Sequence, residues 1–153
     1  MMHSKKKINK ILSVSVVVVL LAVMILPIIS VIADNSYIVI RTAEDYAALV
    51  SKCKNDAWSQ GKTVSLEADI DLSYGEFKPI PTFGGYFRGN GYTITGINIK
   101  SKGSNYGLFR YIQSGATVEN LNVKGEVFPE GTKKRIGGIV GECSGILKNC
   151  NFE

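Results

Sequence analysis

Two carboxylates lie two residues apart in a segment of strand-type sequence, a spacing that could support chemistry. Asp69 and Asp71 alternate with Ile70 and Leu72, so both carboxylates point to one face of an extended strand. Such a pair could bind Ca²⁺ through hard oxygen ligands, or supply the acid and base of sugar cleavage. The alternation equally describes two solvated residues beside buried ones, and we favour this second interpretation. Asp69 and Asp71 are therefore weak metal-site candidates, and no catalytic residue is predicted.

An aromatic-rich stretch around two prolines is the second candidate. Exposed aromatic side chains can stack on sugar rings or contact a protein partner. Core packing is the simpler role for most of the stretch, and Phe87, Phe109 and Tyr106 are expected to fill corners of the core. Tyr74 and Tyr86 are the best candidates for surface binding. The stretch contains Tyr74, Phe77, Phe83, Tyr86, Phe87 and Tyr92.

The cysteine and histidine content argues against several kinds of site. Cys53, Cys143 and Cys150 form no CxxC pair and have no spacing suited to zinc. A Cys143–Cys150 disulfide and a buried Cys150 thiol both remain open, and the odd number leaves at least one thiol unpaired in a monomer. His3 lies in the N-terminal segment, so the rest of the chain has no imidazole for a metal or a hydrolytic triad. We expect no cofactor.

The N-terminal segment is typical of an export signal. Four lysines in the first ten residues precede an apolar run from Ile11 to Ala33. Pro27 breaks the run, and Val31 and Ala33 fit the small-residue pattern of a cleavage site before Asp34. The alternative is an uncleaved membrane anchor, because about 20 apolar residues can span a bilayer. The sequence therefore predicts a signal peptide over 1–33 and a secreted or cell-surface bacterial protein.

Removing this segment changes the charge balance. The chain carries a formal net charge of +5, but four of its 18 Lys and Arg residues lie in the segment. From Asp34 onward the remaining 14 face 13 Asp and Glu residues. The high isoelectric point therefore reflects targeting, and we expect no nucleic-acid partner.

A strand and a helix are expected over 34–61, ahead of β-type sequence over 62–153. YIVI at 37–40 has strand character, and Thr42 is a good N-cap. Apolar residues then recur at helical spacing, and Gly61 ends the pattern. The expected buried face of the helix is Tyr46, Leu49, Val50 and Cys53.

Three seven-residue segments share one apolar pattern: TITGINI at 93–99, TVENLNV at 117–123 and ILKNCNF at 146–152. In each, the second, fifth and seventh residues are apolar, the fourth is Gly or Asn, and the sixth is Asn. The predicted repeat core is Ile94, Ile97, Ile99, Val118, Leu121, Val123, Leu147, Cys150 and Phe152.

This pattern predicts a parallel β-solenoid of about three coils. A plain strand would keep alternate residues inward, whereas here the alternation slips by one at the Gly or Asn. Gly and Asn tolerate left-handed backbone, so one bend per turn keeps both apolar sides inward. The helix would cover the first coil, whose backbone and core would otherwise be exposed. The alternative is a β-sandwich, in which 93–99 and 117–123 would pair antiparallel.

The succession LEADIDLSYGEFKPIPTFGGYFRGNGYTITGINI, YGLFRYIQSGATVENLNVKG and IGGIVGECSGILKNCNF resembles the GLUG-motif proteins of bacterial surfaces. The motif also occurs in the IgA1-protease family of streptococcal metallopeptidases. The resemblance extends from Thr42 to Glu153, and its most specific parts are DIDL, Phe87–Ile94 and the GLF and GGIVG turns. It implies a right-handed parallel β-helix. HExxH and LPxTG motifs are absent from this sequence, so it implies neither peptidase activity nor wall anchoring, and the chain looks like an N-terminal fragment without the peptidase module.

These observations predict an exported, non-catalytic, adhesin-type β-solenoid module. Its role would be structural or partner-binding, with a host or cell-surface protein or a glycan as partner, and with membrane contact only through an uncleaved signal segment. Two alternatives remain open. The chain could be a fragment of a secreted carbohydrate-active β-helix enzyme, or a truncated reading frame without a function of its own.

Overall fold

The computed structural model describes residues 36–100, 103–128 and 135–153. The predicted signal peptide, 1–33, and its cleavage point between Ala33 and Asp34 lie outside these residues.

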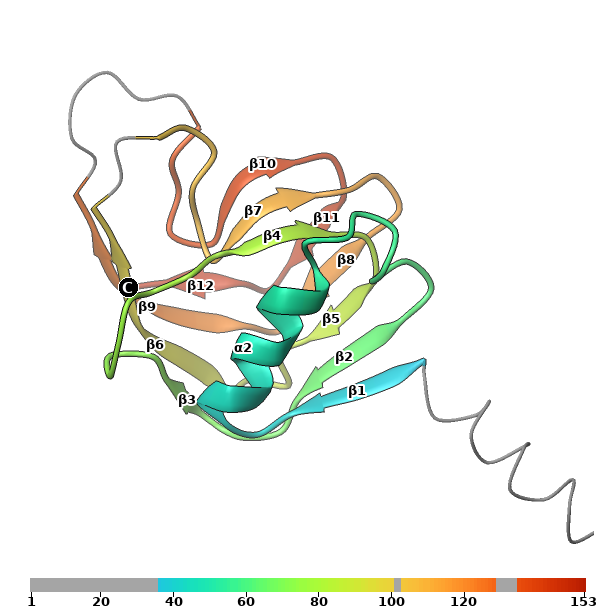
Figure 1. The fold of residues 1–153 in the computed structure, drawn as a ribbon, viewed down its shortest axis with the longest axis horizontal. Helices are drawn as coiled ribbons and strands as arrows, with labels where there is room; N and C mark the ends of the chain where they lie inside the picture. The colour runs from blue at the N-terminus through green and yellow to red at the C-terminus, as the bar shows by residue number, and fades with distance from the viewer. Residues whose placement is uncertain (1–35, 101–102, 129–134) are drawn as a thin grey trace, which may run out of the picture. The chain divides into compact units, whose positions relative to one another are not determined.

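The described strands form three parallel sheets (Figure 1). Sheet A contains β1 (Tyr37–Ile40), β2 (Thr63–Leu66), β5 (Tyr86–Arg88), β8 (Thr117–Glu119) and β11 (Ile146–Lys148). Sheet B contains β3 (Ile70–Asp71), β6 (Thr93–Ile99), β9 (Asn122–Val127) and β12 (Asn151–Phe152). Sheet C contains β4 (Ile80–Phe83), β7 (Phe109–Ile112) and β10 (Val140–Cys143).

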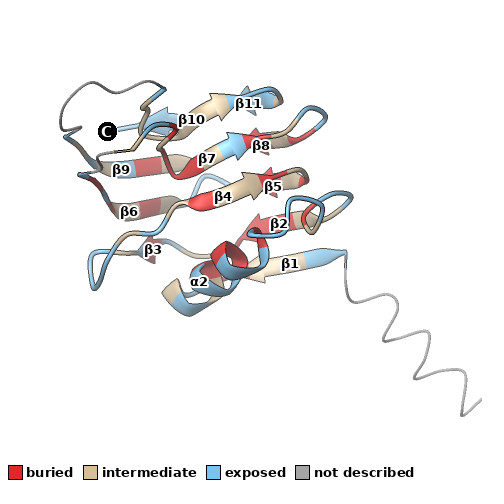
Figure 2. Ribbon diagram, turned by 45° about the horizontal axis from the view of Figure 1, so that its top comes forward, coloured by how far each residue is buried: buried red, intermediate tan, exposed pale blue. Residues whose placement is uncertain are grey.

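The chain visits the three sheets in turn, and this order produces the stack in Figure 2. β2, β3 and β4 make one coil, β5, β6 and β7 the next, and β8, β9 and β10 the third. Every strand pair among the described residues is parallel. The predicted all-β parallel β-helix is therefore confirmed. The stack has about four turns rather than three, because β1 precedes the first full coil and β11 and β12 begin a further one.

The single described helix, α2 (Ala43–Lys52), begins as the sequence predicts. The Thr42 side chain accepts the Asp45 amide at 3.1 Å, and the Asp45 carboxylate accepts the Thr42 amide at 3.1 Å. This reciprocal capping box satisfies two amides that a helix N-terminus leaves without partners. The predicted apolar face is buried, at 7% exposure or less, and comprises Tyr46, Leu49, Val50 and Cys53. It covers the apolar core at the N-terminal end, as expected for a capping helix.

Asparagines turn the chain from sheet A to sheet B after β5, β8 and β11. Asn90, Asn120 and Asn149 all have positive φ, between 51° and 53°. Asn149 donates to the Asn120 side-chain oxygen at 3.1 Å, and Asn90 donates to the Leu66 carbonyl at 2.9 Å. The corner asparagines therefore stack and bond from coil to coil.

The repeat segment 93–99 does not superimpose on the segment 117–123 as the sequence predicts. Thr93 pairs with Asn122, whereas Thr117 pairs with Tyr86 and Ile146. The first segment lies wholly in β6 of sheet B, whereas the second and third segments each run from sheet A through a corner into sheet B. The second and third segments do align as predicted. The asparagine equivalent to Asn122 is therefore Asn151, and Asn98 instead pairs with Glu126.

Gly96 forms a bulge within β6. Its φ is +78°, and the pairing with β9 shifts register between Ile94 and Ile97. A bulge inserts one residue and so restores the inward direction of the side chains after it. Ile94, Ile97 and Ile99 are accordingly all buried.

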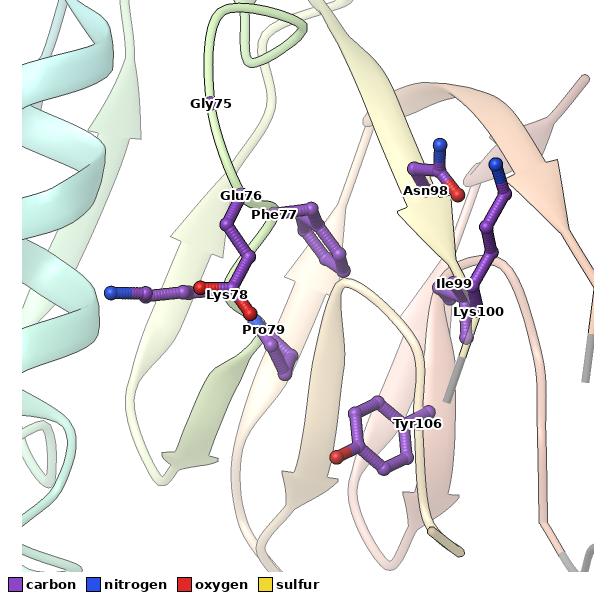
Figure 3. Close-up of a pocket in the computed structure, with 9 residues that line it drawn as sticks. All are labelled: Gly75, Glu76, Phe77, Lys78, Pro79, Asn98, Ile99, Lys100 and Tyr106. Atoms are coloured by element: carbon purple, nitrogen blue, oxygen red, sulfur yellow. The ribbon is translucent and has the colours of Figure 1, made fainter. Parts of the chain in front are cut away.

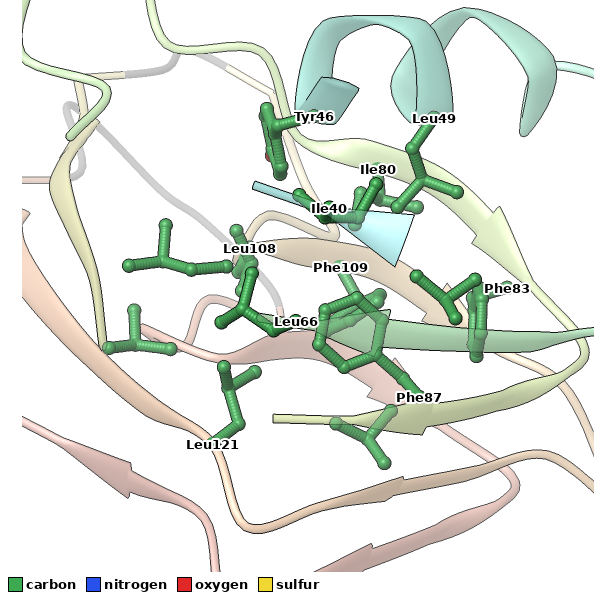
Figure 4. Packing of buried hydrophobic residues seen from close by; sticks show 14 of the residues in the cluster. Ile40, Tyr46, Leu49, Leu66, Ile80, Phe83, Phe87, Leu108, Phe109 and Leu121 are labelled. Atoms are coloured by element: carbon green, nitrogen blue, oxygen red, sulfur yellow. The ribbon is translucent and has the colours of Figure 1, made fainter. Parts of the chain in front are cut away.

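Apolar side chains fill the space between the sheets (Figure 4). Three phenylalanines from sheets A and C meet there, with ring centroids 5.9 Å apart for Phe83 and Phe87, 5.6 Å for Phe83 and Phe109, and 5.4 Å for Phe87 and Phe109. The two pairs that involve Phe87 are edge-on, an arrangement that stabilises a core beyond its buried area. The predicted role of Phe87 and Phe109 as core residues is confirmed.

Candidate binding surfaces

Among the described residues, the two ends of the stack differ in how far their apolar side chains are covered. At the N-terminal end, beneath α2, Ile40, Leu66 and Ile80 are at most 1% exposed. At the other end, Leu147 stacks on Val118 and Phe152 on Val123, yet each is 36% exposed. The last strands therefore leave apolar side chains at a strand edge, which is a template for pairing with another chain.

This open end, formed by β10, β11 and β12, also contains a hollow of about 460 Å³. Its lining is largely apolar. The lining residues are Gly137, Ile139, Val140, Leu147, Asn149, Cys150 and Phe152. Of the nine predicted core residues, the six in the earlier coils are buried, whereas Leu147, Cys150 and Phe152 lie at this end.

A second hollow, of about 600 Å³, lies where the chain passes from sheet B to sheet C (Figure 3). One wall is the loop 75–79, which leads into β4, and the other is the end of β6 with Lys100. Tyr106 comes from the segment that leads into β7. We call this site the corner hollow; it is lined by Gly75, Glu76, Phe77, Lys78, Pro79, Asn98, Ile99, Lys100 and Tyr106.

Hydrogen bonds fix the loop of the corner hollow at both ends. At its start, the Asp71 carboxylate accepts the Ser73 amide at 2.9 Å. At its end, the buried Tyr46 of α2 donates its hydroxyl to the Lys78 carbonyl at 2.8 Å. Burial raises the pKa of Tyr46 well above its usual range, so this hydroxyl stays protonated and keeps donating.

The two predicted metal-site candidates accept hydrogen bonds from backbone amides instead. Asp69 accepts the Thr93 amide of the next coil at 2.7 Å, and Asp71 bonds to Ser73. Hydrogen bonds from the Ser73 side chain and backbone hold the pKa of Asp71 below its usual range. Within the described residues, no three His, Cys, Asp or Glu side chains cluster as a metal site would require.

The aromatic candidates separate into core and surface. Tyr74 is 93% exposed, next to the corner hollow in sequence. Tyr86 is half-buried on sheet A, with the Arg88 guanidinium 5.0 Å from its ring centre. Its hydroxyl bonds to Glu119, which raises the pKa of the phenol. Tyr86 is thus engaged by neighbours from its own sheet, while Tyr74 projects into solvent.

Phe77 and Tyr106 are the functional candidates that the sequence did not identify. Phe77 belonged to the aromatic stretch without a surface role, and Tyr106 was expected in a core corner. Both are half-buried and line the corner hollow. A signal was present in Pro79, which ends the loop before β4 and lines the hollow, whereas Pro81 lies within β4.

The cysteines are free in this structure. Cys53 is buried in the helix face, and burial raises the pKa of its thiol to about 12. Cys143 is exposed and Cys150 half-buried at the open end. A thiol with so high a pKa is chemically inert, which suits the packing role of Cys53.

Comparison with known proteins gives one informative match. The chain is similar to a protein of Evansella cellulosilytica named "Putative Gly-rich membrane protein", with 37% identity over 96 residues. The match covers 59% of this chain and 11% of the relative's length, so the chain corresponds to a small part of that protein. No protein-family model matches the chain, and no solved structure matches it. In the part of the chain that the structure describes, no helix is long and apolar enough to cross a membrane.

Proposed function

We propose that this protein is an exported, non-catalytic β-solenoid module of the GLUG type, which acts at the bacterial surface as a structural and partner-binding element. The observation that carries the proposal is the stack of parallel coils itself, with a helix over its N-terminal end. A solenoid of this kind is a rigid scaffold whose faces and ends are available for contact.

Two further observations support a surface location. The basic and apolar N-terminal segment fits an export signal, and the similar Evansella protein is named as a membrane protein. Its length, about nine times that of the matched segment, is consistent with a module that works as part of a larger surface array.

The structural use of both aspartates supports a non-catalytic role. Asp69 and Asp71 each accept a backbone amide, one between coils and one in a turn. We expect no release of reducing ends from acidic or neutral polysaccharides by the full chain. Release that disappears in the Asp69→Asn variant would instead favour the carbohydrate-active enzyme.

Surface exposure is tested in an exporting Gram-positive host. Intact cells producing the full chain are treated with protease, and the N-terminus of the protein is determined by mass spectrometry. We expect the protease to degrade or release the protein. We expect its N-terminal residue to be Asp34. The matched variant Ala33→Leu should retain the N-terminal segment, because a large residue blocks the small-residue cleavage pattern. Full protection of both the parent chain and the Ala33→Leu variant from the protease would place both inside the cell and would contradict the proposal.

A further inference from the structure

A third hollow, of about 610 Å³, lies on the outer face of sheet C, whose strands β4, β7 and β10 run side by side in Figure 1. Thr82 pairs with Tyr111, and Tyr111 with Glu142, so these three residues form one row across three successive coils. The row faces away from the core, because the residues that follow Thr82 and Tyr111, Phe83 and Ile112, are buried. We call this site the sheet C hollow; its walls include Asp56, Thr82, Tyr111, Gln113, Glu142 and Ser144.

Hydrogen bonds hold the walls of the sheet C hollow in place. The buried Asn105 amide donates to the Tyr111 hydroxyl at 2.7 Å and to the Glu142 carboxylate at 3.0 Å. The Gln113 side chain ties the loop after α2 to β7, because it donates to the Asp56 carbonyl at 3.1 Å and accepts the Gln60 side-chain amide at 3.1 Å. A preformed site spends less of its interaction energy on ordering side chains. The volume of the hollow is also within the usual range of small-molecule sites, roughly 300–1,000 Å³.

Tyr111 gives the hollow an aromatic surface. The residue is 37% exposed, although its hydroxyl is fixed by Asn105. The Arg110 guanidinium lies 5.8 Å from the centre of the Tyr111 ring, and Arg110 is not among the residues that line the hollow. An aromatic ring that is held in position and partly exposed can pack against the C–H face of a sugar ring.

The polar groups of the hollow are mostly oxygen atoms. The Asp56 and Glu142 carboxylates can accept hydrogen bonds, and the hydroxyls of Thr82 and Ser144 can both donate and accept them. Neither Lys nor Arg lines the hollow. Glu142 is already paired with Arg135 at 2.9 Å, whereas Asp56 forms no ion pair among the described residues. The charge that remains unpaired in the hollow is therefore negative, which disfavours an anionic ligand.

We infer that the sheet C hollow binds a neutral saccharide. The C–H face of one sugar ring packs on Tyr111, and the sugar hydroxyls donate to the Asp56 carboxylate and exchange hydrogen bonds with Thr82 and Ser144. A purely apolar ligand would bury these oxygen atoms without partners, which is costly. A small ion would leave the Tyr111 ring unused, and an acidic sugar would bring its carboxylate close to Asp56. A neutral saccharide uses both the ring and the oxygen atoms.

The inference rests on the partner-binding part of the proposed function and deepens it by naming a site and a ligand class. The test is a titration of the nitrogen-15-labelled full chain, purified as the exporting host delivers it, followed by the NMR shifts of its amides. The neutral probes are cellotriose and maltotriose, which differ in their linkage. The charged probe is cellotriose with its primary hydroxyls oxidised to carboxylates. We expect saturable shifts at Thr82, Gln113 and Ser144 with at least one neutral probe, and none at Lys124 of sheet B.

The charge of Asp56 predicts an order of affinities. Cellotriose should bind at least about twofold more tightly than its oxidised form, and the difference should shrink in high salt. Asp56→Asn should also bring the two probes closer together, because it removes the unpaired carboxylate. Glu126→Gln, at an exposed carboxylate of β9, is the matched control and should leave the difference unchanged.

Two tyrosines of nearly equal exposure test the ring contact. Tyr111→Leu should weaken the binding of the neutral probe by about fivefold, from the loss of the aromatic surface. Tyr92→Leu is the matched control, because Tyr92 is 38% exposed and lies outside the hollow, and it should change nothing. Tyr111→Phe keeps the ring and should bind within about twofold of the parent chain. Urea unfolding of the three variants shows whether each is folded.

Three results would overturn the inference: no saturable shifts with either neutral probe, tighter binding of the oxidised probe, or equal effects of Tyr111→Leu and Tyr92→Leu. The first two are measured on the parent chain, so they do not depend on the folding of a variant. The titration uses purified protein, so such a failure is distinguishable from a failure of export. Protease treatment of intact cells still reports whether the module reaches the surface.

Discussion

Gly96 offers a sharp test of how the solenoid is built, because Gly91 in the same coil provides a matched comparison. Both glycines have left-handed backbone, with φ of +78° at Gly96 and +81° at Gly91. A Cβ added at Gly91 would meet nothing within 4 Å. A Cβ added at Gly96 would lie 2.3 Å from the Ser73 amide nitrogen and 2.7 Å from the Leu72 carbonyl carbon. The two alanine variants therefore share the backbone strain and differ in the clash with the preceding coil.

The expected magnitudes follow from these two terms. Left-handed backbone costs an L-residue roughly 1–2 kcal/mol, partly offset by the stiffer unfolded chain of alanine, so Gly91→Ala should lose about 1 kcal/mol. Overpacking adds roughly 1–3 kcal/mol, and at Gly96 the obstructing atoms belong to the backbone of another coil. Gly96→Ala should therefore lose about 2–4 kcal/mol of unfolding free energy.

Urea unfolding followed by far-ultraviolet circular dichroism measures both losses on the exported chain. The slope with urea should stay the same in both variants, because the surface exposed on unfolding does not change. Equal losses for Gly96→Ala and Gly91→Ala would refute the close approach of the coils at the bulge. It would also remove the reason for glycine at this position of β6.

Three further predictions concern the cap, the loop and the core. Thr42→Ala should lower the unfolding free energy by about 1 kcal/mol in urea, because the Asp45 amide loses its acceptor; Thr42→Ser should keep most of it, and equal losses would argue against the capping box. The lowered pKa of Asp71 means that its hydrogen bonds to Ser73 stabilise the fold above about pH 4 and that this contribution disappears as pH falls through the folded-state pKa; Asp71→Asn should therefore show a smaller loss of melting temperature between pH 5 and 3 than the parent, and parallel curves would contradict this. Phe87→Leu should cost about 2 kcal/mol, since it keeps an apolar side chain and removes two ring contacts, and a loss below about 0.5 kcal/mol would show that the rings add nothing beyond burial.

Local signals predicted the helix well, because each depends on residues close in sequence. Thr42 and Asp45 are three residues apart, and the capping box needs nothing else. The buried face of α2 follows from a spacing that any helix imposes. The slipped alternation at Gly96 was also informative, since a positive φ and a bulge are properties of one residue in its own strand.

The register could not be obtained in the same way, because it depends on which sheet each segment enters. Asn98 resembles Asn122 in its local surroundings, yet Asn98 pairs with Glu126. The segment 93–99 lies wholly in sheet B, whereas 117–123 runs from sheet A into sheet B, and similar residues at similar positions cannot reveal this difference. The corner hollow could not be predicted from the sequence for a related reason. Phe77 and Tyr106 are far apart in the chain, and only the stacking of coils brings their loops to one site.

The two candidate surfaces depend on different parts of the stack. The corner hollow is built from the coils nearest the helix, and Tyr46 of α2 holds its loop through the Lys78 carbonyl. The open end is built from the last strands, where Leu147 and Phe152 have no further coil above them among the described residues. In a solenoid each coil contacts chiefly its neighbours, so local changes travel poorly along the stack. A contact made at the open end can therefore form without disturbing the hollow, and a ligand in the hollow can bind whatever the open end contacts.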